Sequence, residues 1–213
     1  MSSNQIKKLV RGIPEPTIRR MPLYLSYLKT LDLNEKTYIS APKMAKVFGF
    51  DATQITKDIG YTNVVGKTRV GFDIKELIPA IEDFLGFNKK NDAFLVGVGN
   101  LGAALTKYGG FEKTGFKILA AFDIDPTKVG TEINNTKVLH LDKFQNLAER
   151  MHVTIGIITV PDEYAQQIAD KMVSWGIKAI WNFAPTPIKA NEDIIVENTS
   201  IYSNLAVIIK KLK

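Results

Sequence analysis

The pattern Gly-x-Gly-x-x-Gly, formed by Gly97, Gly99 and Gly102, constrains the fold of this chain more than any other feature. An apolar run at residues 93–96 precedes it, and a short helix-forming run at 103–105 follows. Gly97 allows a sharp turn off a strand, Gly99 lets a pyrophosphate approach the backbone, and Gly102 lets the new helix pack against the strand. The order predicts a Rossmann-like parallel sheet that binds a dinucleotide. The alternative is a parallel sheet with an ordinary glycine turn and no ligand.

A second strand is expected at residues 117–122, and it ends in Asp123. A carboxylate roughly 20 residues after the glycine pattern can bind the hydroxyls of the adenosine ribose. It would also repel a 2′-phosphate, which favours NAD(H) over NADP(H), although the basic Lys128 lies close by in sequence.

The remainder of this half alternates between strands, expected at 138–139, 153–160 and 179–182, and helices, expected at 141–151 and from Asp162. That alternation predicts a mostly parallel sheet with helices on both faces and a ligand beyond the carboxyl ends of the strands. For the strand-end residues, simple strand termination is the alternative. The candidate cofactor residues are Gly97, Val98, Gly99, Asn100, Leu101, Gly102, Asp123, Lys128, Thr159, Val160, Asn182, Ala184 and Pro185.

The N-terminal part has the pattern of a winged helix-turn-helix domain. Pro14 and Pro16 indicate a non-helical entry, and Thr17 is the expected N-cap of a helix that runs to about residue 31. Pro22 is expected near the first turn of this helix, with a kink as the alternative. Two short helices follow, 41–48 capped by Ser40 and 54–59 capped by Asp51 or Thr53, then a β-ribbon at 64–72, a helix at 74–85 and a polar hinge at 86–92.

Charge supports a polyanionic partner for this part. Residues 1–90 hold 15 Lys and Arg against 9 Asp and Glu, whereas residues 91–213 hold 13 of each. Lys7, Lys8 and Arg11 form a basic lead-in. A solvated lysine-rich surface, or a winged module that binds protein, is the alternative.

Double-stranded DNA is favoured over RNA because no aromatic sheet face is expected here. Gln54, Thr56 and Lys57 on the second short helix are side chains that contact bases and phosphates in the major groove, and Lys67 and Arg69 lie near the tip of the wing. The candidate DNA-binding residues are Ser40, Lys43, Gln54, Thr56, Lys57, Lys67 and Arg69.

Several classes of protein are not indicated. The chain has no cysteine, residues 1–5 do not resemble a signal peptide, and no run of about 18 apolar residues occurs, so a cytoplasmic protein is expected. His140 and His152 are expected near helix boundaries and not at strand ends, without a metal-ligand pattern, and no catalytic acid–base pair stands out. We therefore expect no catalysis and no metal. The alternatives are a small NAD-dependent oxidoreductase with an accessory domain, or a CoA- or nucleotide-binding adaptor.

Three domains are predicted: residues 1–86 bind DNA, residues 87–198 bind NAD(H), and residues 199–213 form a C-terminal helix that packs either on its own domain or, as a dimerisation helix, on a partner chain. The last segment has apolar residues at helical spacing, namely Ile201, Leu205, Ile208, Ile209 and Leu212.

Taken together, the segments 13–24, 54–59, 97–102, 122–130, 159–161 and 182–185 resemble the Rex family of bacterial redox-sensing transcriptional repressors. The resemblance covers nearly the whole chain. It implies a homodimer whose C-terminal helix swaps onto the other subunit. It also implies binding to operator DNA and release when NADH replaces NAD.

The resemblance also assigns roles to residues. It implies that the glycine turn holds the pyrophosphate, that Asp123 holds the ribose, and that Arg20 and Tyr108 lie near the junction that transmits the signal. The chain departs from the family at Thr56, where an arginine is usual, and in the wing, where the arginine is shifted to position 69. It departs again at Ser200, where the family has an aspartate that would pair with Arg20.

Overall fold

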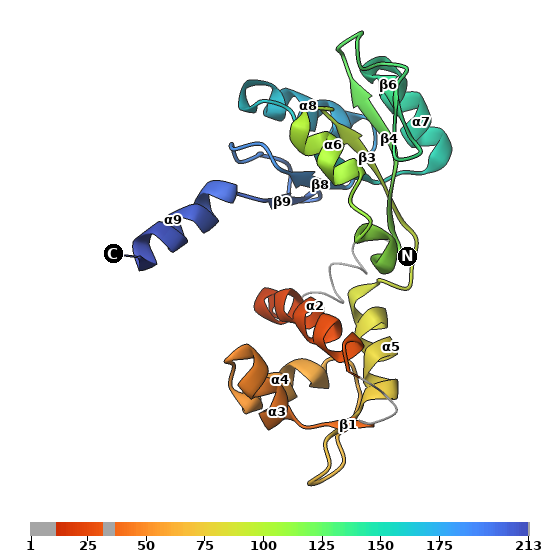
Figure 1. Cartoon of the computed structure of the whole chain (residues 1–213). Helices are drawn as coiled ribbons and strands as arrows, with labels where there is room; N and C mark the ends of the chain where they lie inside the picture. Colours follow the sequence, from red (N-terminus) through yellow and green to blue (C-terminus); the bar gives the residue numbers. More distant parts are fainter. Residues whose placement is uncertain (1–11, 32–36, 213) are drawn as a thin grey trace. The chain divides into compact units, whose positions relative to one another are not determined.

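A computed structural model describes residues 12–31 and 37–212. The described chain divides into two compact units between Lys89 and Lys90 (Figure 1). The predicted boundaries at residues 86 and 198 stay predictions. The basic lead-in of Lys7, Lys8 and Arg11 lies outside the described residues.

The first unit is a winged helix-turn-helix. Its helices are α2 (Glu15–Lys29), α3 (Ala41–Phe48), α4 (Ala52–Gly60) and α5 (Ile74–Leu85), and its antiparallel strands are β1 (Tyr38–Ile39) and β2 (Phe72–Asp73). Gly49 ends α3 in the left-handed conformation, with φ +69°, and the Asp51 carboxylate caps α4 by accepting the Thr53 N–H at 2.7 Å. The two caps set the turn between α3 and α4, as predicted for the helix-turn-helix.

Apolar residues from all four helices build the core of this unit. Met21 and Leu28 of α2 pack with Ile55 of α4 and Leu77 of α5, and each is fully buried. These positions follow the three- and four-residue spacing that places side chains on one helix face.

The predicted start of α2 is wrong. The helix begins at Glu15, because Pro14 supplies an extended N-cap residue and Pro16 sits in the first turn, where its missing N–H costs nothing. Thr17 is therefore inside the helix and buried, and Pro22 falls in the middle of α2 instead of its first turn.

The wing is shorter than the ribbon predicted at 64–72. A single antiparallel bridge joins Lys67 to Gly71. β2, which follows the bridge, pairs with β1. Gly71 has φ +108°, and a Cβ there would collide with the Ile39 carbonyl, so the base of the wing lies directly against β1.

A buried carboxylate ties α4 to α2. Asp58 of α4 has no exposed surface, and its side chain accepts hydrogen bonds from Thr17 Oγ1 (2.9 Å), Arg20 Nε and Nη2 (2.6 and 2.8 Å), Tyr24 OH (2.8 Å) and Gln54 Nε2 (2.9 Å). Burial raises the pKa of Asp58, but these donors together outweigh it and hold its pKa below the ordinary value. Asp58 is therefore ionised in the folded protein at neutral pH.

The second unit is a doubly wound α/β domain. Its seven strands are β3 (Asn91–Val96), β4 (Phe116–Asp123), β5 (Glu132–Ile133), β6 (Thr136–His140), β7 (Ile155–Ile158), β8 (Ala179–Asn182) and β9 (Ile195–Asn198). The sheet order is β5-β6-β4-β3-β7-β8-β9, with every neighbouring pair parallel except β5 and β6. Without β5 this is the order of dinucleotide-binding folds, and the chain reverses direction across the sheet between β3 and β7.

Alternate residues of the central strands pack into two hydrophobic cores, one on each face of the sheet. Phe94 and Val96 face α7 (Phe144–Met151) and α8 (Asp162–Ser174) on one side, and Ala93 and Leu95 face α6 (Asn100–Thr106) on the other. Because both faces are covered, these strands are continuously apolar.

Parts of this unit differ from the expectation. β3 begins at Asn91, inside the predicted hinge, since Asn91 already pairs with Phe116. β5 and β9 were not predicted, being short edge strands with little apolar character. A turn of 3-10 helix, η2 (Leu141–Lys143), occupies the start of the predicted helix 141–151. The expectation that His140 does not lie at a strand end is wrong: it is the last residue of β6, in register with Asp123, and it also caps η2.

The final helix, α9 (Ile201–Lys211), is exposed along its whole length. Within residues 12–31 and 37–212, no helix combines the length and the apolar character needed to traverse a membrane.

We expect Asp58→Ala to lower the free energy of unfolding by about 3 kcal/mol, because it leaves the largely buried Arg20 guanidinium without its carboxylate. Urea unfolding of the full chain followed by circular dichroism measures this. Glu15→Gln is the control, since it breaks the exposed Arg19–Glu15 pair of the same helix and should have little effect.

The loss should depend on pH. The lowered pKa of Asp58 means that its stabilisation is present above the unfolded pKa of about 3.9 and disappears as pH falls through the folded value. The stability difference between wild type and Asp58→Ala should therefore shrink below about pH 4. A difference that is unchanged between pH 7 and pH 3 contradicts this account.

Candidate functional site

The glycine turn after β3 is packed against the end of β7. Gly97 has φ +99° and donates its N–H to the Phe122 carbonyl at 2.9 Å. A Cβ at Gly97 would lie 2.8 Å from backbone atoms of Thr159. Only glycine satisfies both the dihedral angle and this contact.

Gly102 closes the same turn from the side of α6. A Cβ there would collide with the Gly97 carbonyl oxygen, which also accepts a hydrogen bond from Thr159 Oγ1 at 2.7 Å. The first turn of α6 and the ends of β3 and β7 therefore converge on one carbonyl group. Gly99 is different, because nothing lies within 4 Å of where its Cβ would be.

Asp123, the last residue of β4, is fixed beside this turn. Its carboxylate accepts the N–H groups of Val98 (2.7 Å) and Asp125 (2.9 Å), and Lys128 Nζ lies 3.3 Å away. Burial raises the pKa of Asp123, but the two backbone donors and the ammonium outweigh it, so its pKa stays below the ordinary value. The carboxylate is thus charged and oriented.

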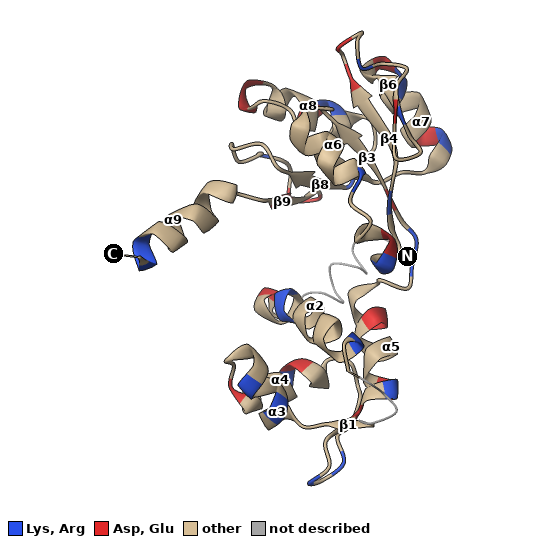
Figure 2. Ribbon diagram, viewed as in Figure 1, with Lys and Arg blue, Asp and Glu red and all other residues tan. Residues whose placement is uncertain are grey.

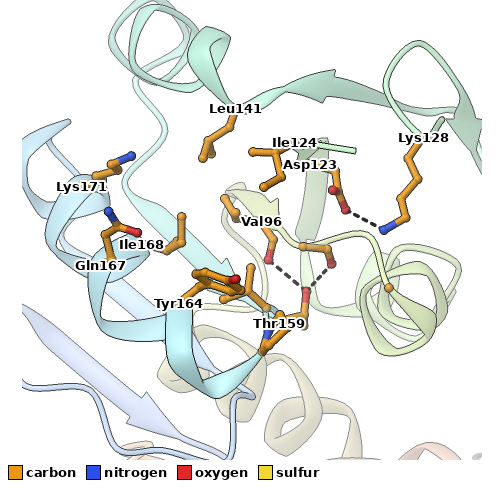
Figure 3. Close-up of a pocket in the computed structure, with 14 residues that line it drawn as sticks. Val96, Asp123, Ile124, Lys128, Leu141, Thr159, Tyr164, Gln167, Ile168 and Lys171 are labelled. Atoms are coloured by element: carbon orange, nitrogen blue, oxygen red, sulfur yellow. Dashed lines mark hydrogen bonds and ion pairs between the residues drawn. The ribbon is translucent and has the colours of Figure 1, made fainter. Parts of the chain in front are cut away.

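A cavity of about 490 Å³ opens at this end of the sheet (Figure 3). Figure 3 shows Asp123 and Lys128 on one side of it, and Tyr164, Gln167 and Lys171 on the α8 side. Its lining is mostly apolar, with few charged groups, as is typical of small-ligand sites. It is lined by Val96, Gly97, Gly99, Asp123, Ile124, Lys128, Leu141, Thr159, Val160, Pro161, Tyr164, Gln167, Ile168 and Lys171.

The structure brings only some of the candidate cofactor residues to this cavity. Gly97, Gly99, Asp123, Lys128, Thr159 and Val160 line it, while Val98, Asn100, Leu101 and Gly102 belong to the adjoining turn and helix. Asn182, Ala184 and Pro185 are not among the lining residues. The Asn182 amide is buried and bonded to Thr186 O (2.7 Å) and Asn198 Oδ1 (2.9 Å), so it ties the end of β8 to β9. A role for these three in binding stays a prediction.

Sequence reasoning missed the α8 wall of the cavity. Tyr164, Gln167, Ile168 and Lys171 have helical spacing and share one face of α8. The signal was present, because Pro161, three residues after the end of β7, is the N-cap residue of α8. In such folds the ligand lies beyond the carboxyl ends of the strands where the strand order reverses, so the face of the following helix that points there borders the ligand.

The candidate DNA-binding residues gather on α3, α4 and the wing of the first unit. Lys43, Thr56, Lys57, Lys67 and Arg69 are exposed, and Ser40 and Gln54 are half-buried. Figure 2 shows Lys and Arg along α3, α4 and the hairpin that forms the wing. These elements are the parts of a helix-turn-helix that contact duplex DNA.

Three of these side chains already have partners within the unit. Thr56 Oγ1 donates to Ala52 O at 2.9 Å, and Gln54 donates to Asp58. Lys67 Nζ donates to Tyr38 OH at 2.6 Å, and this hydrogen bond raises the pKa of Lys67. The same ammonium lies 4.8 Å from the centre of the Tyr38 ring. Arg69 occupies the turn of the wing with φ +64°.

The two residues expected to transmit a signal lie in different units. The Arg20 guanidinium is engaged by Asp58, and this contact raises its pKa, while the Tyr108 side chain is 60% exposed. Among the described residues, no group of three His, Cys, Asp or Glu side chains is placed to hold a metal ion.

Comparison with known proteins agrees with this division into units. Residues 88–186 match the family model "CoA binding domain", and residues 12–59 match the model "Putative DNA-binding protein N-terminus". The "Redox-sensing transcriptional repressor Rex" of Bacteroides fragilis is 47% identical over 211 residues, 99% of this chain and 96% of that protein. The Rex repressor of Treponema denticola is 40% identical and covers 91% of this chain and 92% of that protein.

The chain belongs to the Rex family.

Solved Rex structures have the same fold. RSP, a Rex-family repressor, bound to β-NAD⁺ and operator DNA matches with a TM-score of 0.88 and 34% identity, covering 94% of this chain and 92% of RSP. RSP bound to β-NADH matches with a TM-score of 0.84 and covers 94% of both chains. The predicted combination of a winged helix-turn-helix and a Rossmann-like domain is confirmed. Rex proteins are transcriptional repressors, so the oxidoreductase and adaptor alternatives are not supported.

The glycines of the Rex-family turn predict a sharp contrast. Gly99→Ala should preserve stability, because its methyl group meets open space, yet weaken NADH binding about 10-fold or more by keeping the ligand away from the backbone. Gly102→Ala should destabilise the fold by about 1–3 kcal/mol through overpacking against the Gly97 carbonyl.

Thermal unfolding and NADH titration of both variants measure the two effects. Gly60→Ala is the control. A Cβ at Gly60 meets open space, and Gly60 belongs to the first unit, so this variant should change neither the thermal stability nor the NADH affinity. Gly176 is unsuitable because its φ of +91° would strain an alanine. A Gly99→Ala variant that binds NADH normally would show that the ligand does not approach this turn.

Proposed function

We propose that this chain represses transcription by binding operator DNA through its first unit, and that NADH, on replacing NAD in the second unit, releases the DNA. The observation that carries the proposal is the presence, on one chain, of a basic winged helix-turn-helix and a preformed cavity at the switch point of a dinucleotide fold. The Rex membership of the whole chain supports the same function.

The cavity fits a dinucleotide on chemical grounds. Gly99 leaves room for a pyrophosphate beside the start of α6, and the oriented Asp123 carboxylate suits two ribose hydroxyls. Ile124, Leu141 and Ile168 supply an apolar wall for an adenine ring. The charge of Asp123 disfavours a 2′-phosphate, which supports NAD(H) as the ligand.

The residues of the chain bind and orient the dinucleotide, and the redox state of the nicotinamide, when bound, supplies the signal. A pair of ligands shifts the DNA-binding equilibrium only by the difference in their affinities for the two states of the protein. The chain therefore needs no catalytic group, only contacts that distinguish NADH from NAD.

For the DNA contacts, we assign Gln54, Thr56 and Lys57 of α4 to the major groove and Arg69 to the minor groove or its flanking phosphates. We assign Lys43, in the first turn of α3 after the N-cap Ser40, to a phosphate contact. These assignments are supported by the solvent exposure of Lys43, Thr56, Lys57 and Arg69. Lys67 is held by Tyr38, so it stabilises the base of the wing while keeping its charge near the DNA.

We further propose that the chain is a homodimer built through α9. Every described side chain of α9 is exposed, although Ile201, Leu205, Ile208 and Leu212 form one apolar stripe. An isolated apolar helix of this length gains stability only by packing on another surface. A twofold dimer would also present two winged helices to two half-sites. We place the protein in the cytoplasm, where chromosomal DNA and NAD(H) are both available to a bacterial repressor.

The dimer predicts that Leu205→Gln combined with Ile208→Gln converts the protein to a monomer in light scattering. Ser203→Gln, on the opposite side of α9, is the control and should leave a particle of twice the chain mass. A monomeric wild type, or a dimeric double variant, would contradict the role of α9.

The function itself is tested with a labelled duplex selected by this chain from a random-sequence library in the presence of NAD. The dissociation constant, measured by anisotropy at fixed salt, should be about 10-fold or more higher in NADH than in NAD. Affinity should also fall steeply as salt rises, because phosphate contacts release counterions.

Asp123→Ala should bind the duplex but lose most of the response to NADH. Equal affinity for the duplex in NAD and NADH would remove the sensing function, and absence of duplex binding at low salt would remove the repressor function.

A further inference from the structure

The side-chain amide of Gln54 is held by Asp58 one turn later on the same helix. Gln54 Nε2 and Asp58 Oδ1 are 2.9 Å apart. Asp58 is completely buried, whereas Gln54 is half-buried and lies between the exposed residues Thr53 and Lys57 on α4. The bond therefore joins an internal anchor to a side chain on the surface assigned to DNA.

The Asp58 carboxylate determines the orientation of the Gln54 side-chain amide. An ionised carboxylate accepts hydrogen bonds and donates none, so Gln54 must direct Nε2, and not Oε1, at Asp58. Within the described part of the chain, Oε1 and the second amide hydrogen of Gln54 have no partner. One acceptor and one donor thus remain, side by side.

Asp58 itself cannot move to follow Gln54. Arg20 grips both oxygens of the carboxylate, with Nε 2.6 Å from Oδ2 and Nη2 2.8 Å from Oδ1. Thr17 and Tyr24 add one hydrogen bond each, and all three donors belong to α2. A bidentate arginine pair fixes geometry as well as charge.

Stability alone is a weak reason for this arrangement. Buried ion pairs often contribute no more to stability than apolar residues of similar volume, because both charges must be desolvated. The arrangement does, however, set the rotamer of Gln54 before any ligand binds. Preorganisation of this kind reduces the entropy lost on binding.

We propose that Asp58 is a positioning residue that presets the Gln54 amide to recognise one adenine in the major groove. The proposal rests on the proposed function as a DNA-binding repressor. An adenine edge presents the N7 acceptor and the N6 donor, which match the free donor and acceptor of a glutamine amide. The amide would accept from N6 and donate to N7 while its other N–H stays on Asp58.

The test is selection from a random-sequence duplex library, with base preference at each position measured by sequencing the bound pool. Wild type is compared with Gln54→Ala, Gln54→Glu and Asp58→Asn. Glu149→Gln is the matched control, because it changes another carboxylate that accepts from a glutamine four residues away, Gln145, in the second unit. Circular dichroism establishes that each variant is folded.

Wild type should prefer adenine about 5-fold or more at one position of each half-site. Gln54→Ala should lose that preference and keep the preferences at other positions. Gln54→Glu should also lose that preference, because a second carboxylate is repelled by Asp58 and has no donor for adenine N7. Asp58→Asn should weaken the same preference selectively, whereas a purely structural Asp58 would lower affinity for all sequences alike. Glu149→Gln should match wild type.

The proposal is overturned if Gln54→Ala retains every base preference of wild type, or if a folded Asp58→Asn variant loses affinity uniformly. Failure of the proposed function looks different, because wild type would then enrich no duplex at all.

Discussion

The carbonyl group of Gly97 is the point on which the second unit depends. Gly102 of α6 touches it, and the Thr159 hydroxyl donates to it at 2.7 Å, so the ends of β3 and β7 and the start of α6 are held together. This convergence lies at the topological switch point of the sheet. The cavity lies beyond the carboxyl ends of these neighbouring strands, where the order of the strands reverses. Gly99 is the one glycine of the pattern whose Cβ position is open.

In the first unit, a buried charged group, the Asp58 carboxylate, holds the helices together. Helix α4 is short, and Ile55 and Ile59 are its only fully buried apolar residues, so apolar packing alone would fix its position weakly. The Asp58 carboxylate, gripped by three side chains of α2, specifies one arrangement. Each unit thus has its own core and its own internal anchor, and each is suited to its own ligand.

Much of this organisation could be predicted from sequence where local chemistry dominates. β8 at Ala179–Asn182 and α5 at Ile74–Leu85 have the predicted bounds, because apolar runs and the Asp73 and Gly86 caps define them locally. Other features depend on distant partners. Thr17 has the residue type of a cap but is buried against Asp58, 41 residues away, and β9 exists only through its pairing with β8. The α8 wall of the cavity also depends on distant partners, because Tyr164 and Lys171 border the cavity only once α8 packs beside the strand ends.

A single chain that binds both DNA and NADH must obey reciprocity, because coupling between two ligands is one free energy shared by both. The most direct test is calorimetric titration of NADH into the protein alone and into the protein saturated with its selected duplex. We predict that the duplex raises the dissociation constant of NADH by the same factor by which NADH raises that of the duplex. An NADH affinity that is identical with and without saturating duplex would contradict the account.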